Sequence, residues 1–157
     1  MNRLVLLGTG CPAPSHKRFG PSTLIEINGE RYLFDTGSGV TQRLNELGLK
    51  SSDIDLVFIT HMHSDHIVDL YQLYISGWHQ GRNKPFKIIG PVGIKHFFTK
   101  QLESYFDELK LRKEYEMRPN EVGLDYEIIE IDDDFKFANK NLSIKPFYVD
   151  HAPVNPA

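Results

Sequence analysis

Apolar positions in the first third of the chain follow the period of β-strands and then change to helical spacing. Strands are predicted at the three apolar segments of this region, residues 4–7, 22–27 and 31–34. Asn28-Gly29, between the second and the third, is a dipeptide typical of a two-residue hairpin turn. From residue 38 the apolar residues recur every three to four positions until Gly48, which predicts a helix over residues 38–48.

The remaining two thirds alternate between the same two periods. Further strands are predicted at residues 54–60, 86–89, 126–131, 135–137 and 142–149, and helices at residues 67–76 and 93–106. Residues 107–121 are dense in charges of both signs, which predicts a solvated helix end or a loop. Strands interleaved with helices predict an α/β or α+β fold.

Composition narrows the class of protein. A chain of 157 residues with 40% hydrophobic and 25% charged residues is typical of one soluble globular domain. No apolar run approaches the length needed to span a membrane. The single cysteine, Cys11, rules out an intrachain disulfide and predicts a reducing compartment, the cytoplasm. The formal net charge of −3 gives no support to a broad nucleic-acid surface, although a local basic patch remains compatible with it.

The strongest chemical pattern is the segment Thr60-His61-Met62-His63-Ser64-Asp65-His66. It contains three of the seven histidines and a carboxylate, and it follows directly after an apolar run. Imidazole and carboxylate together are ligands for zinc or a similar divalent metal. His61 and His63 are two residues apart, so on an extended segment their side chains point the same way. Asp65 and His66 come where a helix is predicted to begin. Helix capping by Ser64 or Asp65 is the alternative interpretation, and it leaves the histidine spacing unexplained.

Two further residues at strand ends are candidates for the same site. His151 ends the last predicted strand and would be a third nitrogen ligand beside His61 and His63, leaving a fourth position for water. A lone surface histidine is the alternative. Asp35 ends the strand before Thr36-Gly37, and it either caps the following turn or orients the ligand segment by hydrogen bonds.

The segment Gly8-Thr9-Gly10-Cys11-Pro12-Ala13 fits the dinucleotide-binding pattern G-x-G-x-x-A only superficially. That pattern requires a helix to begin there, and the prolines that follow disfavour one. We predict a tight loop beside the site instead. His16, Lys17 and Arg18 lie on this loop, where they are either solvated or in contact with an anionic substrate.

These segments together resemble the metallo-β-lactamase fold superfamily. Asp35-Thr36-Gly37 resembles its first motif, His61-x-His63-x-Asp65-His66 its second and His151 its third. Within the superfamily, three segments resemble the ribonuclease Z and arylsulfatase-like branch: residues 6–10, 34–39 and 149–153.

The resemblance implies a four-layer αββα sandwich and a site for two zinc ions, with manganese or iron as other metals. His61, His63 and His151 would hold the first ion. Asp65 and His66 would hold part of the second, and Asp65 would also accept a proton from the activated water. An aspartate that bridges the ions and a further histidine are expected after the third motif. We therefore expect residues 1–157 to form one hydrolase domain that lacks its C-terminal part.

The resemblance also implies hydrolysis of an anionic ester, either a small molecule or RNA, and phosphodiester hydrolysis is the first prediction. An arylsulfatase, a lactonase or a thioester hydrolase is the alternative, because the motif fixes the metal chemistry but not the bond. A non-catalytic metal-binding fragment is the non-enzyme alternative. Transfer-RNA processing is disfavoured, since ribonuclease Z grips tRNA with a basic arm and residues 107–121 are mixed in charge. No membrane partner is expected, and a homodimer is compatible with these predictions.

Overall fold

The computed structural model describes residues 2–10, 12–116, 121–132 and 134–151. Six strands form one sheet in the order β1-β2-β3-β4-β5-β6, and β7 pairs with β8 in a second sheet. The strands are β1 (Arg3–Gly8), β2 (Ser22–Ile27), β3 (Glu30–Phe34), β4 (Leu56–Phe58), β5 (Phe86–Pro91), β6 (Tyr126–Ile131), β7 (Phe137–Ala138) and β8 (Ser143–Ile144). The helices are α1 (Val40–Glu46), α2 (Ser64–Ile67), α3 (Leu70–His79), α4 (Ile94–Ser104) and α5 (Phe106–Tyr115), with short 3₁₀ turns η1 (Ser51–Asp53) and η2 (Val122–Leu124).

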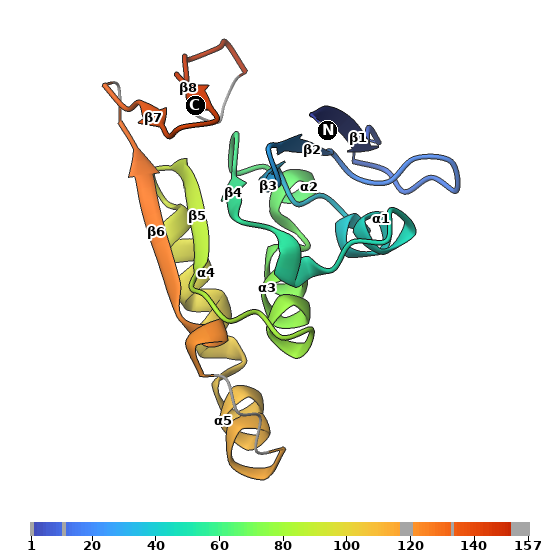
Figure 1. Cartoon of the computed structure of the whole chain (residues 1–157). Helices are drawn as coiled ribbons and strands as arrows, with labels where there is room; N and C mark the ends of the chain where they lie inside the picture. The colour runs from blue at the N-terminus through green and yellow to red at the C-terminus, as the bar shows by residue number, and fades with distance from the viewer. Residues whose placement is uncertain (1, 11, 117–120, 133, 152–157) are drawn as a thin grey trace.

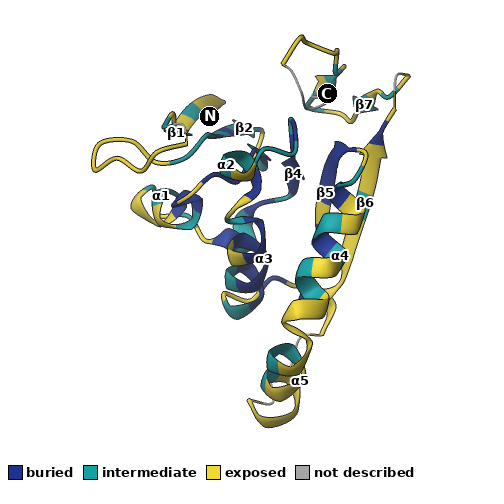
Figure 2. Cartoon of the chain, turned by 180° about the vertical axis from the view of Figure 1, so that it is seen from behind, coloured by how far each residue is buried: buried dark blue, intermediate teal, exposed yellow. Residues whose placement is uncertain are grey.

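The main core lies between the six-stranded sheet and its helices. β1 to β3 pair antiparallel, whereas β3 to β6 run parallel, and the connections from β3 to β6 carry the helices. Leu24, Leu33, Val57 and Ile88 are in register across four neighbouring strands, and all are at most 1% exposed. They pack against buried residues of α1, α3 and α4. Figure 1 shows α4 behind β5 and β6, and Figure 2 shows it in front of them.

The opposite face of the sheet carries a smaller core under the β7–β8 hairpin. Tyr32, Phe58 and Ile89 are buried there, and Phe137 of β7 packs against this group. The cover is partial among the described residues, because Leu4 and Ile129 on this face remain 62% and 51% exposed. Of the αββα sandwich, the described residues therefore form one helical layer, a six-stranded sheet and one hairpin of the next layer.

Helix boundaries differ from the sequence-based predictions mainly around the histidine cluster. The predicted strand over 54–60 shortens to β4, since η1 ends only at Asp53 and the chain leaves the sheet after Phe58. Helix formation starts at Ser64 rather than at residue 67, so Asp65 and His66 lie on α2. The predicted helix over 93–106 is α4. Residues 107–121 contain a separate helix, α5, with no buried residue, and residues 117–120 of that prediction lie outside the described residues.

The predicted strand over residues 142–149 is wrong for most of its length. Only Ser143–Ile144 pairs, and residues 145–151 have no regular structure. Pro146 cannot donate a ladder hydrogen bond, and β7 is the one strand that pairs with β8 in the described part of the chain. β6 and β8 also fall in different sheets. Figure 1 shows the hairpin beyond the end of β6, with α5 projecting at the opposite end.

The loop that follows β1 is held at its base by close backbone contacts. The Gly10 amide donates to the Phe19 carbonyl at 2.7 Å, and the Gly20 amide donates to the Ser38 carbonyl at 2.9 Å. A Cβ atom on Gly20 would lie 2.3 Å from the Ser38 nitrogen, so a side chain does not fit there. No helix begins in the described part of this segment, in agreement with the prediction of a loop here.

No helix among the described residues combines the length and the apolar character needed to cross a bilayer.

Candidate metal centre

The candidate site lies where two parallel neighbours, β3 and β4, leave the sheet. The carboxyl ends of parallel strands meet at one edge, where open α/β sheets place their ligands. The Asp35 amide donates to the Phe58 carbonyl at 2.8 Å, which joins the two strand ends. Residues 59–63 then form the loop between β4 and α2, so the histidine segment begins at this edge.

His61, His63 and His151 offer three nitrogen atoms that all lie within 4.8 Å of one another. His61 Nε2 lies 3.0 Å from His63 Nδ1, and His151 Nε2 lies 3.2 Å from the same atom. Tetrahedral zinc with bonds of about 2.0–2.1 Å separates neighbouring nitrogen ligands by about 3.3 Å. The two separations at His63 Nδ1 are thus close to those expected for ligands of one tetrahedral ion. His151 comes from a segment 88 residues beyond His63 in sequence.

Asp35 is buried beside this cluster and contacts both ends of the histidine segment. Its Oδ1 accepts from the Thr60 amide at 2.8 Å, and its Oδ2 accepts from His66 Nδ1 at 2.7 Å. Its backbone φ of 61° is in the left-handed region, which few residues other than Gly, Asn and Asp adopt readily. These contacts would hold His66 in the tautomer that presents Nε2 to an ion.

Thr60 links Asp35 to His61. Its hydroxyl lies 2.9 Å from Asp35 Oδ2 and 2.9 Å from His61 Nδ1. If the hydroxyl donates to the carboxylate, it accepts from Nδ1–H, and the lone pair of His61 Nε2 then points into the cluster. The sequence pattern gave Thr60 no such role, because a threonine at a strand end has no distinguishing spacing.

The pKa values of His61 and His66 shift in opposite directions. Burial, followed by the neighbouring charge of His66, lowers the pKa of His61 and favours the neutral imidazole that a metal requires. Burial opposes the charged form of His66 as well, but the hydrogen bond and the charge of Asp35, with the charge of Asp65, raise its pKa overall. His66 Nε2 lies 3.8 Å from Asp65 Oδ2. This pair lies next to the three-histidine cluster, where part of a second ion site was predicted.

Asp69 connects the start of α3 to the start of α1. Its carboxylate accepts from the Gly39 amide at 2.6 Å, and its own amide donates to the Thr36 carbonyl at 3.0 Å. The Thr36 amide in turn donates to the His66 carbonyl at 2.7 Å. Burial raises the pKa of Asp69. The backbone of α2 is thus fixed from two sides, an arrangement that the sequence did not suggest for Asp69.

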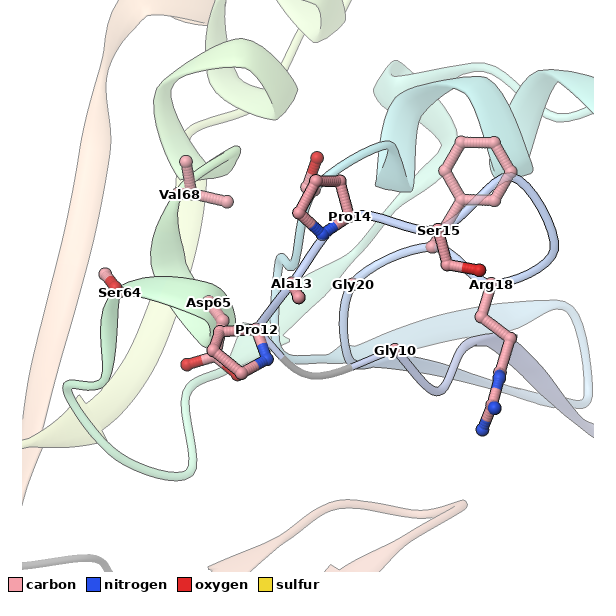
Figure 3. Close-up of a pocket in the computed structure, with 12 residues that line it drawn as sticks. Gly10, Pro12, Ala13, Pro14, Ser15, Arg18, Gly20, Ser64, Asp65 and Val68 are labelled. Atoms are coloured by element: carbon pink, nitrogen blue, oxygen red, sulfur yellow. The ribbon is translucent and has the colours of Figure 1, made fainter.

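A cavity of about 400 Å³ lies against Asp65. Residues of the loop after β1 form one wall and residues of α2 form the other, as Figure 3 shows for Pro12 to Pro14 and for Ser64 and Asp65. Among the described residues that line it, Arg18 is the one cation, and Ser15, Ser38 and Ser64 add hydroxyl groups. The loop lies beside the site, as the sequence suggested, and Arg18 rather than His16 or Lys17 lines the cavity.

The segment that ends α3 does not reach the site. Arg82 is 2% exposed, its guanidinium lies over the rings of Tyr74 and Phe86, and its Nη2 donates to the Gly123 carbonyl at 2.7 Å. His79 lines a separate hollow between α3 and α5. Residues 79 and 82 therefore have their contacts away from the candidate metal centre.

The sheet with helices on one face and the histidine cluster at its strand ends define a metallo-β-lactamase fold of the ribonuclease Z branch. The chain belongs to the family described as anti-Pycsar protein Apyc1, whose model matches residues 2–157.

Relatives of known sequence and structure agree with this placement. The chain is 34% identical to a ribonuclease Z of Mycolicibacterium gilvum, in an alignment that covers 99% of this chain and 55% of the relative. It resembles the crystal structure of human short-form tRNase Z with a TM-score of 0.67 and 30% identity, over 83% of this chain and 45% of that one. The metallo-β-lactamase fold protein YhfI of Bacillus subtilis gives 0.72 at 18% identity, over 98% and 54% of the two chains. The chain thus spans about half the length of the curated relatives that it matches.

Proposed function

We propose that the protein is a zinc-dependent hydrolase related to ribonuclease Z, and that phosphodiesters are its substrate class. The observation that carries the proposal is the convergence of His61, His63 and His151 on one point, with Asp65 and His66 beside them. A zinc ion held by these nitrogens would supply a water nucleophile at neutral pH. Manganese or iron would be the other metals for the same imidazole and carboxylate ligands.

The residues around the cluster have distinct roles in this proposal. The Asp65 carboxylate lines the cavity and would accept a proton from the attacking water. Asp35 and Thr60 would hold His66 and His61 in their ligating tautomers. Arg18 would attract the anionic ester into the cavity, and the serine hydroxyls would bind its oxygens.

A small anionic ester is favoured over a long RNA by the charges of α5. Lys110, Arg112 and Lys113 each pair with a glutamate, at distances between 2.6 and 3.9 Å. Cations that are already neutralised release few counterions from a phosphate backbone. This helix, the most protruding part of the structure, is therefore a poor RNA grip (Figure 1). A reducing location such as the cytoplasm fits the single cysteine.

The test is a hydrolysis screen of the complete protein against a phosphodiester, a sulfate ester, a lactone and a thioester. We expect phosphodiester turnover that a chelator abolishes and zinc restores, and that Asp65→Asn loses while zinc stays bound. Turnover of another ester class alone would replace the substrate assignment. Chelator-resistant turnover, or wild-type rates in Asp65→Asn, would contradict the mechanism.

A further inference from the structure

The contacts that fix the position of His151 differ from those that fix His61 and His63. His61 and His63 lie between β4 and α2, next to the main core. His151 is exposed and ends a stretch, residues 145–151, without regular structure. The β7–β8 hairpin that leads into this stretch has two paired positions in each strand, and such a short hairpin is marginal by itself. Its direction must come from contacts with the six-stranded sheet.

One set of contacts lies at the hairpin turn. Asn139 Oδ1 accepts from the amides of Asn141 and Leu142 at 2.9 and 2.8 Å, which closes the turn. Asn139 Nδ2 donates to the Tyr32 hydroxyl at 2.6 Å and to Glu30 Oε2 at 3.2 Å. A single side chain thus shapes the turn and fastens it to β3.

Glu30 is the centre of this network. Its Oε2 also accepts from Asn141 Nδ2 at 2.7 Å and from the Tyr32 hydroxyl. Asn28, in the turn between β2 and β3, donates to Asn141 Oδ1 at 2.9 Å. Two turns that are 109 to 113 residues apart in sequence therefore meet through side-chain hydrogen bonds. Hydrogen bonds to an ionised carboxylate are stronger than those between neutral groups.

We propose that Glu30 is a positioning residue for the candidate metal centre, because it holds the β7–β8 turn on the β2–β3 turn and so directs residues 145–151 toward His63. The inference rests on the proposed role of His151 as a ligand. Phe137, 5.5 Å from the Phe58 ring, holds the middle of the hairpin, and Glu30 holds its tip. With both points fixed, the chain after β8 has a defined starting direction. Glu30 does not touch the ion, so its effect is on the affinity of the site.

The first experiment measures zinc affinity by competition with a chromophoric chelator. Glu30→Ala should weaken binding about 10-fold, at the lower end of the range for residues that orient metal ligands. Glu30→Gln keeps an acceptor oxygen without the charge, so its loss should be smaller. Glu26→Ala is the matched control, because Glu26 lies on the same hairpin and pairs with Arg3 and Arg31 of the first sheet. The affinity of this control should equal that of the wild type.

The second experiment separates positioning from general destabilisation. In a His151→Ala background, Glu30→Ala should cause no further loss of zinc affinity, because its effect acts through His151. The cobalt absorption spectrum of Glu30→Ala should shift toward that of His151→Ala. Additive losses, or an equal loss in Glu26→Ala, would overturn the inference. Wild-type affinity in Glu30→Ala would overturn it as well, whereas wild-type affinity in His151→Ala would overturn the proposed metal site itself.

Discussion

The two sides of the candidate metal centre are built in different ways. His61, at 7% exposure, belongs to a segment fixed by Asp35, Thr60 and the ends of two core strands. His151 is exposed, and its Nε2 lies 3.2 Å from His63 Nδ1. The first side is thus positioned by the packing of the main sheet, and the second by a hairpin laid across it. Removal of the buried ligand His61 is expected to affect both folding and chemistry, whereas removal of the exposed ligand His151 is expected to affect chemistry alone.

The largest effect is expected at Asp65. In the complete protein, Asp65→Ala should lower turnover by about 10²–10⁴-fold, the range for loss of a general base. The first metal should remain bound, because the three histidine nitrogens are unchanged. Turnover and metal content are measured on the same preparation. Loss of that metal in Asp65→Ala would mean that Asp65 binds the first ion, contrary to this assignment.

Ligand removal tests the asymmetry directly. His61→Ala and His151→Ala should each weaken zinc binding beyond the roughly 100-fold limit for orienting residues. In metal-free protein, His61→Ala should also lower the free energy of unfolding by about 0.5–1.5 kcal/mol, because it removes a buried side chain together with its hydrogen bond to Thr60. His151→Ala should change it by less than about 0.5 kcal/mol, as surface substitutions do. Equal changes in urea denaturation would contradict the comparison.

Substitution of Asp35 should change zinc affinity only through the residues on the buried side of the site. Asp35→Ala should weaken zinc binding about 10- to 100-fold by releasing His66 and Thr60. Asp35→Asn should be milder, because asparagine tolerates the same left-handed backbone and keeps one acceptor. Calorimetric titration with zinc measures both variants. Equal losses in the two variants would show that the charge of Asp35, rather than the orientation of its hydrogen bonds, matters at this position.

The smallest effect concerns the hairpin. Phe137 is half-buried against Tyr32 and Phe58, so Phe137→Ala should lower the free energy of unfolding by about 1–2 kcal/mol. Phe147 is 73% exposed, so Phe147→Ala serves as the control and should stay within about 0.5 kcal/mol. Thermal unfolding of metal-free protein compares the two. Matching losses would mean that the segment after β8 packs more firmly than its exposure indicates.

Local patterns predicted the buried side well. The apolar run before Thr60 and the spacing of His61, His63, Asp65 and His66 need only neighbouring residues, so the sequence sufficed to predict the cluster. The pairing of Asp35 with Thr60 and His66 depends on β3 lying next to β4. Strand-end positions suggested that contact, but no sequence pattern specified Thr60 or Asp69.

The exposed side was harder to predict for a physical reason. Residues 142–149 have the composition of a strand, but strand formation requires a partner for the backbone hydrogen bonds, and only Ser143–Ile144 finds one among the described residues. Similarly, the contacts of Glu30 with Asn139 and Asn141 join turns more than 100 residues apart. Asparagine in a turn is ordinary, and only the folded arrangement gives these side chains a distant partner.

The glycine-clamped base of the loop after β1 has an evolutionary consequence. Its base is closed by Gly10 and Gly20, whereas Pro12 to Ser15 line the cavity without belonging to either clamp. Mutations at the tip can therefore change the size and polarity of the cavity while the backbone at Ser38 and the ligand segment stay in place. Selection for a different ester substrate can therefore act on residues 12–15, while the metal ligands and the hydrogen bonds that position them stay unchanged.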